Sequence, residues 1–346
     1  MAILLTGVTG AVGHPLYQAL VKAHQKVFCI VRNAHTRTDI DIPNECLFDG
    51  DITLPNCGLT SEQITHLKAA NITKVLHLAG LVKFDHELKQ QIWEANYQGT
   101  DNILSLGKQI EADEFHYVST AYATQNHRNP YEESKFAAEK LVIESGLPHS
   151  IYRIGIVIGE SKSGITNGFD GYYGFLSGLH EIANVFRKKY NVADQIDLPV
   201  HLICSSTSTL NLVPADWLVD TLIDLVNAGC TGKTFHVVNP EPPLVSDVMK
   251  HGLEMLGIRG VGFVDSKQDL LALTRHQDNF INIIQKGMSK VLKRYEPYVT
   301  HEEVFPLTVT VDVLGKDIVK RFPTTDHALL STCFEYAAER QFGKIA

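Results

Sequence analysis

A tyrosine and a lysine four positions apart, Tyr131 and Lys135, have the types and spacing that acid/base chemistry needs. Residues i and i+4 share one face of a helix, so the phenol and the ammonium would point into the same space. A phenol with a pKa of about 10 exchanges protons poorly at neutral pH until a nearby cation favours its phenolate. The pair therefore predicts a tyrosine acid/base tuned by a lysine. Tyr-x-x-x-Lys is also common on helix surfaces, so its meaning depends on what surrounds it.

A second motif is a glycine-rich segment near the start of the chain. Gly7, Gly10 and Gly13 follow the apolar run Ile3–Thr6 and precede a helical pattern. A strand-to-helix turn of this kind presents free backbone N–H groups and the positive end of the helix dipole, which suit a pyrophosphate. We expect Gly7 to permit the turn, Gly10 to let the phosphates approach and Gly13 to let the helix pack closely. A pyrophosphate at this turn would belong to a dinucleotide cofactor. The remaining residues that we expect to contact this cofactor are Thr9, Ala11 and Val12.

Arg32 stands where the second expected strand, Val27–Val31, ends. A carboxylate at this point would bind the ribose 2′-OH of NAD, whereas an arginine accommodates the 2′-phosphate of NADP. A guanidinium can make a charge-assisted, bidentate contact to that phosphate. The sequence therefore favours NADP (NADPH) over NAD.

Short apolar runs alternate with helix-length amphipathic segments through the first half of the chain. The expected strands are Ile3–Thr6, Val27–Val31, Val75–Leu78, Phe115–Ser119 and Ser150–Ile154. The expected helices are Pro15–Ala23, Ser61–Ala70, Leu88–Ile110 and Tyr131–Ser145. Such alternation predicts an α/β fold with a Rossmann-type, doubly wound parallel sheet, and each motif falls at the carboxyl end of a strand, where such sheets bind ligands.

The pattern changes after Gly159. Ser163–Gly178 reads as an irregular segment over a site. The strand Thr209–Val213, the helix Trp217–Ala228 and the strand Thr234–Val238 could then return the chain to the sheet. We therefore expect an NADP-binding core of residues 1–160 plus about 209–240. A smaller, interwoven α/β substrate-binding lobe would comprise about 161–208 plus 241–346.

Composition limits the classes of partner. The 346 residues carry a net charge of −8 without a basic stripe, so nucleic acid is not expected as a partner. No apolar run approaches the roughly 20 residues of a membrane span, and the N-terminus lacks the features of a secretory leader, so we expect a cytoplasmic protein. The six cysteines form no Cys-x-x-Cys pair and no zinc-ligand spacing. We expect reduced thiols and no metal site.

The order of these motifs resembles the extended short-chain dehydrogenase/reductases. The matching segments are Thr6–Gly13, Asp51-Ile52, His77–Gly80, Asn96 with Gly99-Thr100, Val118–Thr120 and the Tyr131/Lys135 pair. Within that superfamily the chain looks most like the thioester-reductase and fatty acyl-CoA reductase branch. The stretches that carry this likeness are His77–Phe84, Tyr117–Tyr122, Tyr131–Glu139, Arg153–Gly155, Gly159–Ser161 with Gly164, and Asp170-Gly171.

The resemblance implies roles for individual residues. Thr120 would donate a hydrogen bond to the substrate carbonyl oxygen, Tyr131 would protonate the developing alkoxide, and Lys135 would tune Tyr131 and bind the nicotinamide ribose. His77 is expected to be structural. The other residues implied to contact or support the cofactor are Asp51 and Ile52 at the adenine, Ala79 and Gly80 along its path, Ile154 and Val157 at the nicotinamide, and Asn96 beneath that region.

The expected function is NADPH-dependent reduction of a carbonyl, with an acyl thioester giving an aldehyde as the leading substrate. Alternatives are a ketone or aldehyde reductase or alcohol dehydrogenase, a nucleotide-sugar epimerase or dehydratase, and a non-catalytic NADP-sensing regulator. The intact Thr120, Tyr131 and Lys135 argue against the regulator. The aromatic residues that could line an acyl site are Phe84, Phe169, Tyr172, Tyr173 and Phe175.

Three further expectations concern the setting of this site. Only ten residues separate Thr120 from Tyr131, so the loop over the substrate should be short. The sequence shows no adenylation or carrier domain, so we expect a protein that stands alone. The helices Leu88–Ile110 and Tyr131–Ser145 could pair across a two-fold axis in a homodimer, as they do in relatives.

Overall fold

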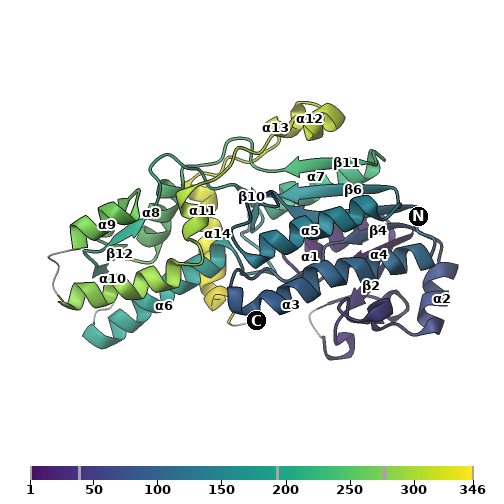
Figure 1. Cartoon of the computed structure of the whole chain (residues 1–346), viewed down its shortest axis with the longest axis horizontal. Coiled ribbons are helices and arrows are strands. Elements are labelled where there is room, and N and C mark those ends of the chain that lie inside the picture. Colours follow the sequence, from purple (N-terminus) through teal and green to yellow (C-terminus); the bar gives the residue numbers. More distant parts are fainter. Residues whose placement is uncertain (1, 38–39, 192–194, 275–278, 345–346) are drawn as a thin grey trace. The chain divides into compact units, whose positions relative to one another are not determined.

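The computed structural model describes residues 2–37, 40–191, 195–274 and 279–344, and the chain divides into two compact units (Figure 1). The first unit comprises Met1–Val157, Ala215–Val238 and Phe305–Phe322, and the second comprises Ile158–Pro214, Asn239–Val304 and Pro323–Ala346.

One segment departs from the expected division of the chain. Phe305–Phe322, which the sequence placed in the second lobe, packs within the first unit. Thr310 Oγ1 donates a hydrogen bond to the carbonyl of His236 at 2.6 Å. Trp217 Nε1 donates to the carbonyl of Ile318 at 3.3 Å. These contacts join residues about 75 to 100 positions apart, which no local pattern could indicate.

Within the described residues, a parallel sheet of seven strands forms the centre of the first unit. The strand order is β11-β6-β5-β4-β1-β2-β3, with neighbouring strands parallel. The order reverses between β1 and β4, which is the point where doubly wound sheets bind ligands. The expected Rossmann-type fold is confirmed. The strands are β1 (Ala2–Thr6), β2 (Lys26–Val31), β3 (Leu47–Asp49), β4 (Ile72–His77), β5 (Glu114–Thr120), β6 (His149–Ile154) and β11 (Lys233–Val237).

Helices cover both faces of this sheet (Figure 1). α1 packs with α7 on one face, and α4 packs with α5 on the other. The expected helix Leu88–Ile110 is interrupted by a π-helical turn at Glu94–Gln98, a feature often found at functional sites. The helices of this unit are α1 (Gly13–Lys22), α2 (Ser61–Ala69), α3 (Lys89–Trp93), α4 (Gly99–Gln109), α5 (Pro130–Glu144), α7 (Ala215–Asn227), α12 (Thr308–Leu314) and α13 (Asp317–Lys320).

The second unit is mainly helical. α6 packs on α10 and α14 packs on α8, while β8 with β12 and β9 with β13 form two short parallel pairs. The helices are α6 (Tyr172–Tyr190), α8 (Val245–Met255), α9 (Lys267–Thr274), α10 (Asn279–Leu292), α11 (Glu296–Thr300) and α14 (His327–Glu339). The strands are β8 (Ile196–Asp197), β9 (His201–Ile203), β12 (Ile258–Arg259) and β13 (Gly262–Val264). β7 (Ile156–Ile158) and β10 (Leu212–Pro214) lie where the chain passes from one unit to the other.

The expectation of an irregular segment at Ser163–Gly178 is wrong for its last seven residues, because α6 begins at Tyr172. Tyr173, Leu176 and Leu179 are buried at helical spacing, so apolar burial decides the conformation there despite the glycines.

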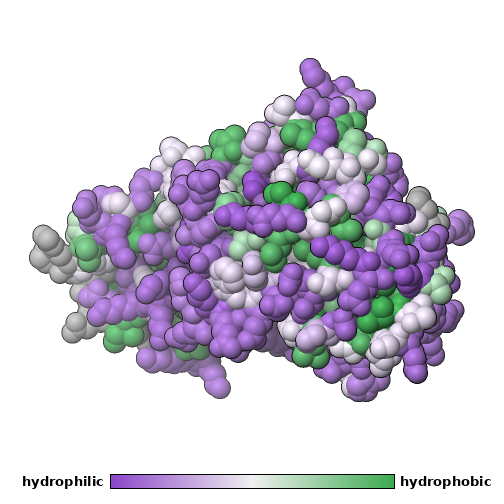
Figure 2. Space-filling view, turned by 45° about the vertical axis from the view of Figure 1, so that its right-hand side comes forward, coloured by the Kyte–Doolittle hydropathy of each residue, from purple (hydrophilic) through white to green (hydrophobic). Residues whose placement is uncertain are grey.

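One face of the surface is mainly hydrophilic. Figure 2 shows a face on which hydrophilic residues dominate and apolar residues occur in small groups. Among the described residues, no helix is both long enough and apolar enough to cross a bilayer.

A buried polar network lies at the start of the strands. Lys74 Nζ donates to Glu114 Oε2 at 2.7 Å and to the carbonyl of Val226 at 3.0 Å. His116 Nε2 lies 3.0 Å from the same carboxylate oxygen, and its Nδ1 lies 2.8 Å from the hydroxyl of Tyr152. The carboxylate can only accept, so Nε2 carries the proton and Nδ1 accepts from the tyrosine. Burial, reinforced by Lys74, lowers the pKa of His116 to about 4.

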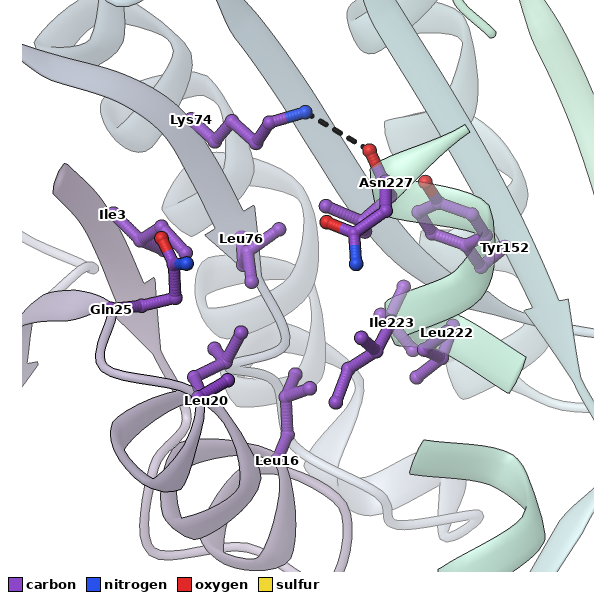
Figure 3. A pocket seen from close by; sticks show the side chains of 13 residues that line it. Ile3, Leu16, Leu20, Gln25, Lys74, Leu76, Tyr152, Leu222, Ile223 and Asn227 are labelled. Carbon is purple, nitrogen blue, oxygen red and sulfur yellow. Dashed lines mark hydrogen bonds between the residues drawn. The ribbon is translucent and has the colours of Figure 1, made fainter. Parts of the chain in front are cut away.

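Lys74 also borders a small cavity of about 60 Å³ on this face of the sheet (Figure 3). The view shows its ammonium directed at the carbonyl that ends α7, where a helix dipole favours a cation. Mainly apolar side chains from α1, α7 and the strands of the sheet form the rest of the wall, among them Leu16, Leu20, Leu76, Leu222 and Ile223.

The network predicts a pH dependence of stability. The folded protein keeps His116 neutral down to about pH 4, whereas the unfolded chain takes up this proton near 6.5. The free energy of unfolding should therefore fall as the pH drops through this window, by roughly 3 kcal/mol from this residue. Urea unfolding between pH 7.5 and 4.5 measures it. His116→Gln should flatten the dependence, and the exposed His86→Gln should not. Equal slopes for His116→Gln and the parent would contradict the prediction.

Candidate active site

The glycine loop joins β1 to α1. Gly7 has a φ of +80°, and a Cβ on it would lie 2.7 Å from the backbone nitrogen of Ala79. A Cβ on Gly13 would lie 2.0 Å from the carbonyl oxygen of Gly7, so Gly13 packs on the loop itself more than on the sheet. The N–H of Gly10 donates to the carbonyl of Gly7 at 3.0 Å. The turn therefore requires glycine at its two ends, and it leads directly into the first turn of α1.

A chain of neutral hydrogen bonds supports this loop from inside the sheet. Thr6 Oγ1 accepts from the N–H of Ala79 at 3.3 Å and lies 2.7 Å from His77 Nδ1. His77 Nε2 lies 3.1 Å from Thr100 Oγ1, which itself donates to the carbonyl of Asn96 at 2.6 Å. Thr100 has thereby used its proton, so His77 Nε2 donates and Nδ1 accepts from Thr6. Burial, with a smaller contribution from Lys135, lowers the pKa of His77 to about 3, so His77 links strands and does not exchange protons near neutral pH.

Asn96 holds the segment that follows β4. Its Oδ1 accepts from the N–H of Leu81 at 2.7 Å, and its Nδ2 donates to the carbonyl of Leu81 and to Ser134 Oγ. A Cβ on Gly80 would lie 2.8 Å from Asn96 Oδ1. The π-helical turn thus places Asn96 between the Ala79–Leu81 segment and α5. Its contacts lie with protein groups, so any influence on a cofactor would pass through that segment.

Lys135 lies on α5, which begins at Pro130 and is capped by Asn129, whose Oδ1 accepts from the N–H of Glu132 at 3.0 Å. Lys135 is 4% exposed. Its Nζ donates to the carbonyl of Val118 at 2.7 Å and lies 4.2 Å from the ring centre of Tyr117. Burial lowers its pKa to about 7. The bond to Val118 positions α5 against the end of β5.

The other two predicted catalytic residues lie at the ends of the same two elements. Thr120 is the last residue of β5 and is paired in register with Ile154 of β6. Its Oγ1 is 3.4 Å from the N–H of Tyr122. Tyr131 is in the first turn of α5, with its ring 5.9 Å from that of Phe84. Hydroxyl, phenol and ammonium thus come from one strand end and from the first two turns of the helix that packs on it.

The loop between Thr120 and Tyr131 is held by a carboxylate that sequence reasoning missed. Glu132 is fully buried and accepts from the backbone N–H of Arg128 and from its Nε and Nη2, at 2.7 to 3.0 Å. The guanidinium lies 4.8 Å from the ring centre of Tyr122. The short loop is therefore clamped at its helix end. Four-residue spacing from Arg128 is the signal that could have indicated this pair.

The residues predicted to lie near the adenine follow the carboxyl ends of β2 and β3. Arg32 follows β2, is 73% exposed, and has Nη1 3.9 Å from Asp51 Oδ2. Asp51 Oδ1 accepts from the N–H and hydroxyl of Thr53. The carbonyl of Ile52 accepts from Asn102 Nδ2 at 2.7 Å. Arg32 thus has a weak, exposed ion pair that a stronger anion could replace.

The aromatic residues that could line an acyl site are divided between the two units. Phe84 contacts Tyr131, as described. In the second unit, Tyr172, Tyr173 and Phe175 are buried, and the ring of Phe169 packs on that of Tyr173 at 5.7 Å. Tyr173 also accepts a hydrogen bond from the N–H of Gly159 at 2.8 Å. Tyr172, Tyr173 and Phe175 thus belong to the core of the second unit, and the half-buried Phe169 packs on it. Val157, expected at the nicotinamide, lies within β7.

A glycine turn before a helix, a hydroxyl at the end of β5 and a tyrosine–lysine pair on α5 define an extended short-chain dehydrogenase/reductase. The chain belongs to the male sterility protein family, which residues 5–129 and 123–222 match, and lies in the thioester-reductase branch. The family and its relatives indicate a nicotinamide cofactor.

Similar proteins include multidomain synthetases. The chain is 27% identical over 283 residues to the nonribosomal peptide synthetase cpsA of Aspergillus campestris, covering 68% of this chain and 25% of that one. It is 26% identical over 239 residues to the fatty acyl-CoA reductase wat of Drosophila melanogaster, covering 50% and 46%. The terminal R domain from the myxalamid PKS-NRPS biosynthetic pathway superposes with a TM-score of 0.72 at 24% identity, covering 99% of this chain and 92% of that one. The chain therefore spans less than half the length of these two curated relatives.

The loop geometry predicts the effect of a single methyl group. Gly13→Ala would place a Cβ against the backbone of Gly7, so the loop must shift. Affinity for the reduced nicotinamide nucleotide should fall at least tenfold, about 1.4 kcal/mol, in a titration that follows nucleotide fluorescence. Gly107→Ala is the matched control, because its Cβ would meet only ordinary contacts at 3.7 Å. Unchanged affinity in Gly13→Ala with a normal unfolding transition would refute the assignment of this loop.

Proposed function

We propose that this protein is an NADPH-dependent reductase that converts an acyl thioester to an aldehyde and a thiol. One observation carries the proposal: the ammonium of Lys135 is buried beside the end of β5 with one hydrogen-bond acceptor, the carbonyl of Val118, among the described residues. An ammonium has three donors, and a buried polar group left unsatisfied is costly. Two hydroxyls of a nicotinamide ribose would complete its hydrogen bonds.

The glycine loop supports the same cofactor. Neither Gly7 nor Gly13 has room for a Cβ in the turn that leads into α1. The backbone N–H groups at the start of α1 would hold the pyrophosphate. When bound, NADPH supplies a hydride to the carbonyl carbon. Every other part of the reaction falls to residues of the chain.

Thr120 and Tyr131 would act on the carbonyl oxygen. As hydride adds to the carbon, negative charge develops on the oxygen, and the hydroxyl of Thr120 stabilises it by donating a hydrogen bond. The phenol of Tyr131 transfers its proton to that oxygen, and the charge of Lys135 stabilises the phenolate left behind. The protonated adduct then breaks its carbon–sulfur bond and passes its hydroxyl proton to the departing sulfur, which gives the aldehyde and the thiol. The phenolate of Tyr131 takes up one proton from the solvent. Thioester, NADPH and one proton thus give aldehyde, thiol and NADP⁺.

The reaction needs no cysteine nucleophile, and the cysteines suit that mechanism. Burial raises the pKa of the Cys29, Cys57 and Cys204 thiols to about 12, so they stay protonated and unreactive near neutral pH. The family branch supports a thioester over a simple ketone or aldehyde, because similar proteins include a fatty acyl-CoA reductase and nonribosomal peptide synthetases.

The reductase proposal predicts consumption of NADPH with acyl thioesters. With acyl-CoA and acyl-pantetheine substrates of several chain lengths, absorbance at the NADPH band should fall as aldehyde and thiol form. Tyr131→Phe should lower kcat roughly 10²- to 10⁴-fold, because it removes the proton donor, and should leave NADPH affinity nearly unchanged.

The same assay includes aldehydes, ketones and nucleotide sugars as competing substrates. Tyr122→Phe is the control variant, because it removes a different phenol, whose ring packs against the guanidinium of Arg128 in the loop. Turnover of ketones but not thioesters would select the ketone-reductase alternative. Tight NADPH binding without any turnover would select the regulator and end the proposal.

Arg32 supports NADPH over NADH, because the 2′-phosphate would replace its weak pair with Asp51. Arg32→Ala should weaken NADPH binding about 10- to 100-fold, the range for hydrogen bonds to a charged group, and change NADH binding little. Lys68→Ala, which removes another exposed ion pair, with Glu111, is the control. Equal affinity of the parent protein for the two nucleotides, measured by calorimetry, would show that Arg32 does not select the cofactor.

A further inference from the structure

The helix face that carries Tyr131 and Lys135 continues to Glu139. Positions i, i+4 and i+8 lie on one side of a helix, so the three side chains form a row along α5. Glu139 is 4% exposed, which is unusual for a carboxylate unless it is paired.

Arg153 of β6 is the partner of Glu139. Arg153 Nε donates to Glu139 Oε1 at 3.0 Å, and Arg153 Nη2 donates to Oε2 at 2.7 Å. The two parallel bonds engage both carboxylate oxygens from the side of the sheet. Arg153 is also the register partner of Ser119 on β5, so this pair lies directly behind the strand end that carries Thr120.

Lys135 and Glu139 are not in direct contact. Among the described residues, no ion pair within 4.0 Å joins them, and Lys135 Nζ is bonded to the carbonyl of Val118 instead. A carboxylate free to rotate would compete for this ammonium and draw it away from Tyr131. By occupying both oxygens, Arg153 leaves Glu139 able to act on Lys135 through its charge alone.

The buried ammonium of Lys135 requires a nearby negative charge to stabilise it. Burial disfavours its ammonium form, and its immediate neighbours offer little compensation. His77 on β4 is neutral, Tyr117 on β5 and Tyr131 on α5 are phenols, and Arg153 on β6 is a cation. Glu139 is the acid that opposes the effect of burial on Lys135.

We propose that Glu139 is a positioning residue: held by Arg153, its carboxylate keeps Lys135 in the ammonium form and directed at the cofactor ribose and Tyr131. This inference rests on the proposed function for its meaning, but not for its test. The glutamate touches neither substrate nor cofactor and acts through the lysine.

Glu139→Gln tests the inference, because it keeps the shape and removes the charge. In protein labelled with ¹³C at the lysine ε-carbons, with Lys135→Arg identifying the resonance, the wild-type Lys135 should titrate with a pKa of about 7. In Glu139→Gln the midpoint should fall by about one pH unit. NADPH affinity should accordingly be roughly tenfold weaker than wild type on the alkaline side of the profile, within about twofold of wild type at pH 6, and nearly equal near pH 5.

Two variants guard against a merely structural explanation. Glu139→Asp keeps the charge and should restore most of the titration midpoint. Glu114→Gln removes another paired carboxylate, at the opposite end of β5, and should lower stability without moving Lys135. If Glu139→Gln fails to fold, the double variant Glu139→Gln/Arg153→Met removes the unpaired cation and should still lower the midpoint.

The outcomes separate the two proposals. An unchanged Lys135 midpoint in Glu139→Gln, or an equal shift in Glu114→Gln, would overturn the role of Glu139. Wild-type protein that binds NADPH yet reduces no thioester would overturn the proposed function, while the titration of Lys135 would still decide the role of Glu139.

Discussion

The burial of one ammonium governs the arrangement of the rest of the site. Lys135 has almost no contact with water, so burial alone drives it toward the neutral amine. A carbonyl at the end of β5 and the face of Tyr117 supply the direct contacts that keep it in place. Its position then determines where the phenol of Tyr131, one turn earlier on α5, can exchange a proton. The packing of α5 on β5 gives Lys135 these contacts.

Neutral hydrogen bonds and ion pairs support different parts of the site. Beneath the glycine loop, Thr6, His77 and Thr100 form a chain of uncharged hydrogen bonds, and burial keeps the histidine from titrating near neutral pH. Buried ion pairs lie on α5 and its neighbours, where the pairs of Glu132 with Arg128 and Glu139 with Arg153 are both bidentate. Neutral links hold the loop at any physiological pH, while paired charges set the field in which Lys135 works.

Many of these features could be predicted from short-range spacing. The glycine loop, Thr120 at a strand end and the four-residue step from Tyr131 to Lys135 are local patterns, and the structure places them at the carboxyl edge of the sheet as expected. The same kind of reasoning failed where burial overrode composition, as at the start of α6. Spacing also left open whether aromatic residues such as Tyr173 line a substrate site or pack in a core, and the structure shows that Tyr173 is buried.

By itself the sequence determined the strand–helix alternation, the loop at the start of the chain and the residues able to do the chemistry, because each depends on neighbours a few positions apart. Only the tertiary structure decided that Phe305–Phe322 packs in the first unit and that Asn96 faces Leu81. It likewise decided that Glu139 is buried against Arg153 rather than exposed on a helix. These features depend on which distant segments share a low-dielectric interior, where a charge must find a partner, and no local spacing records that choice.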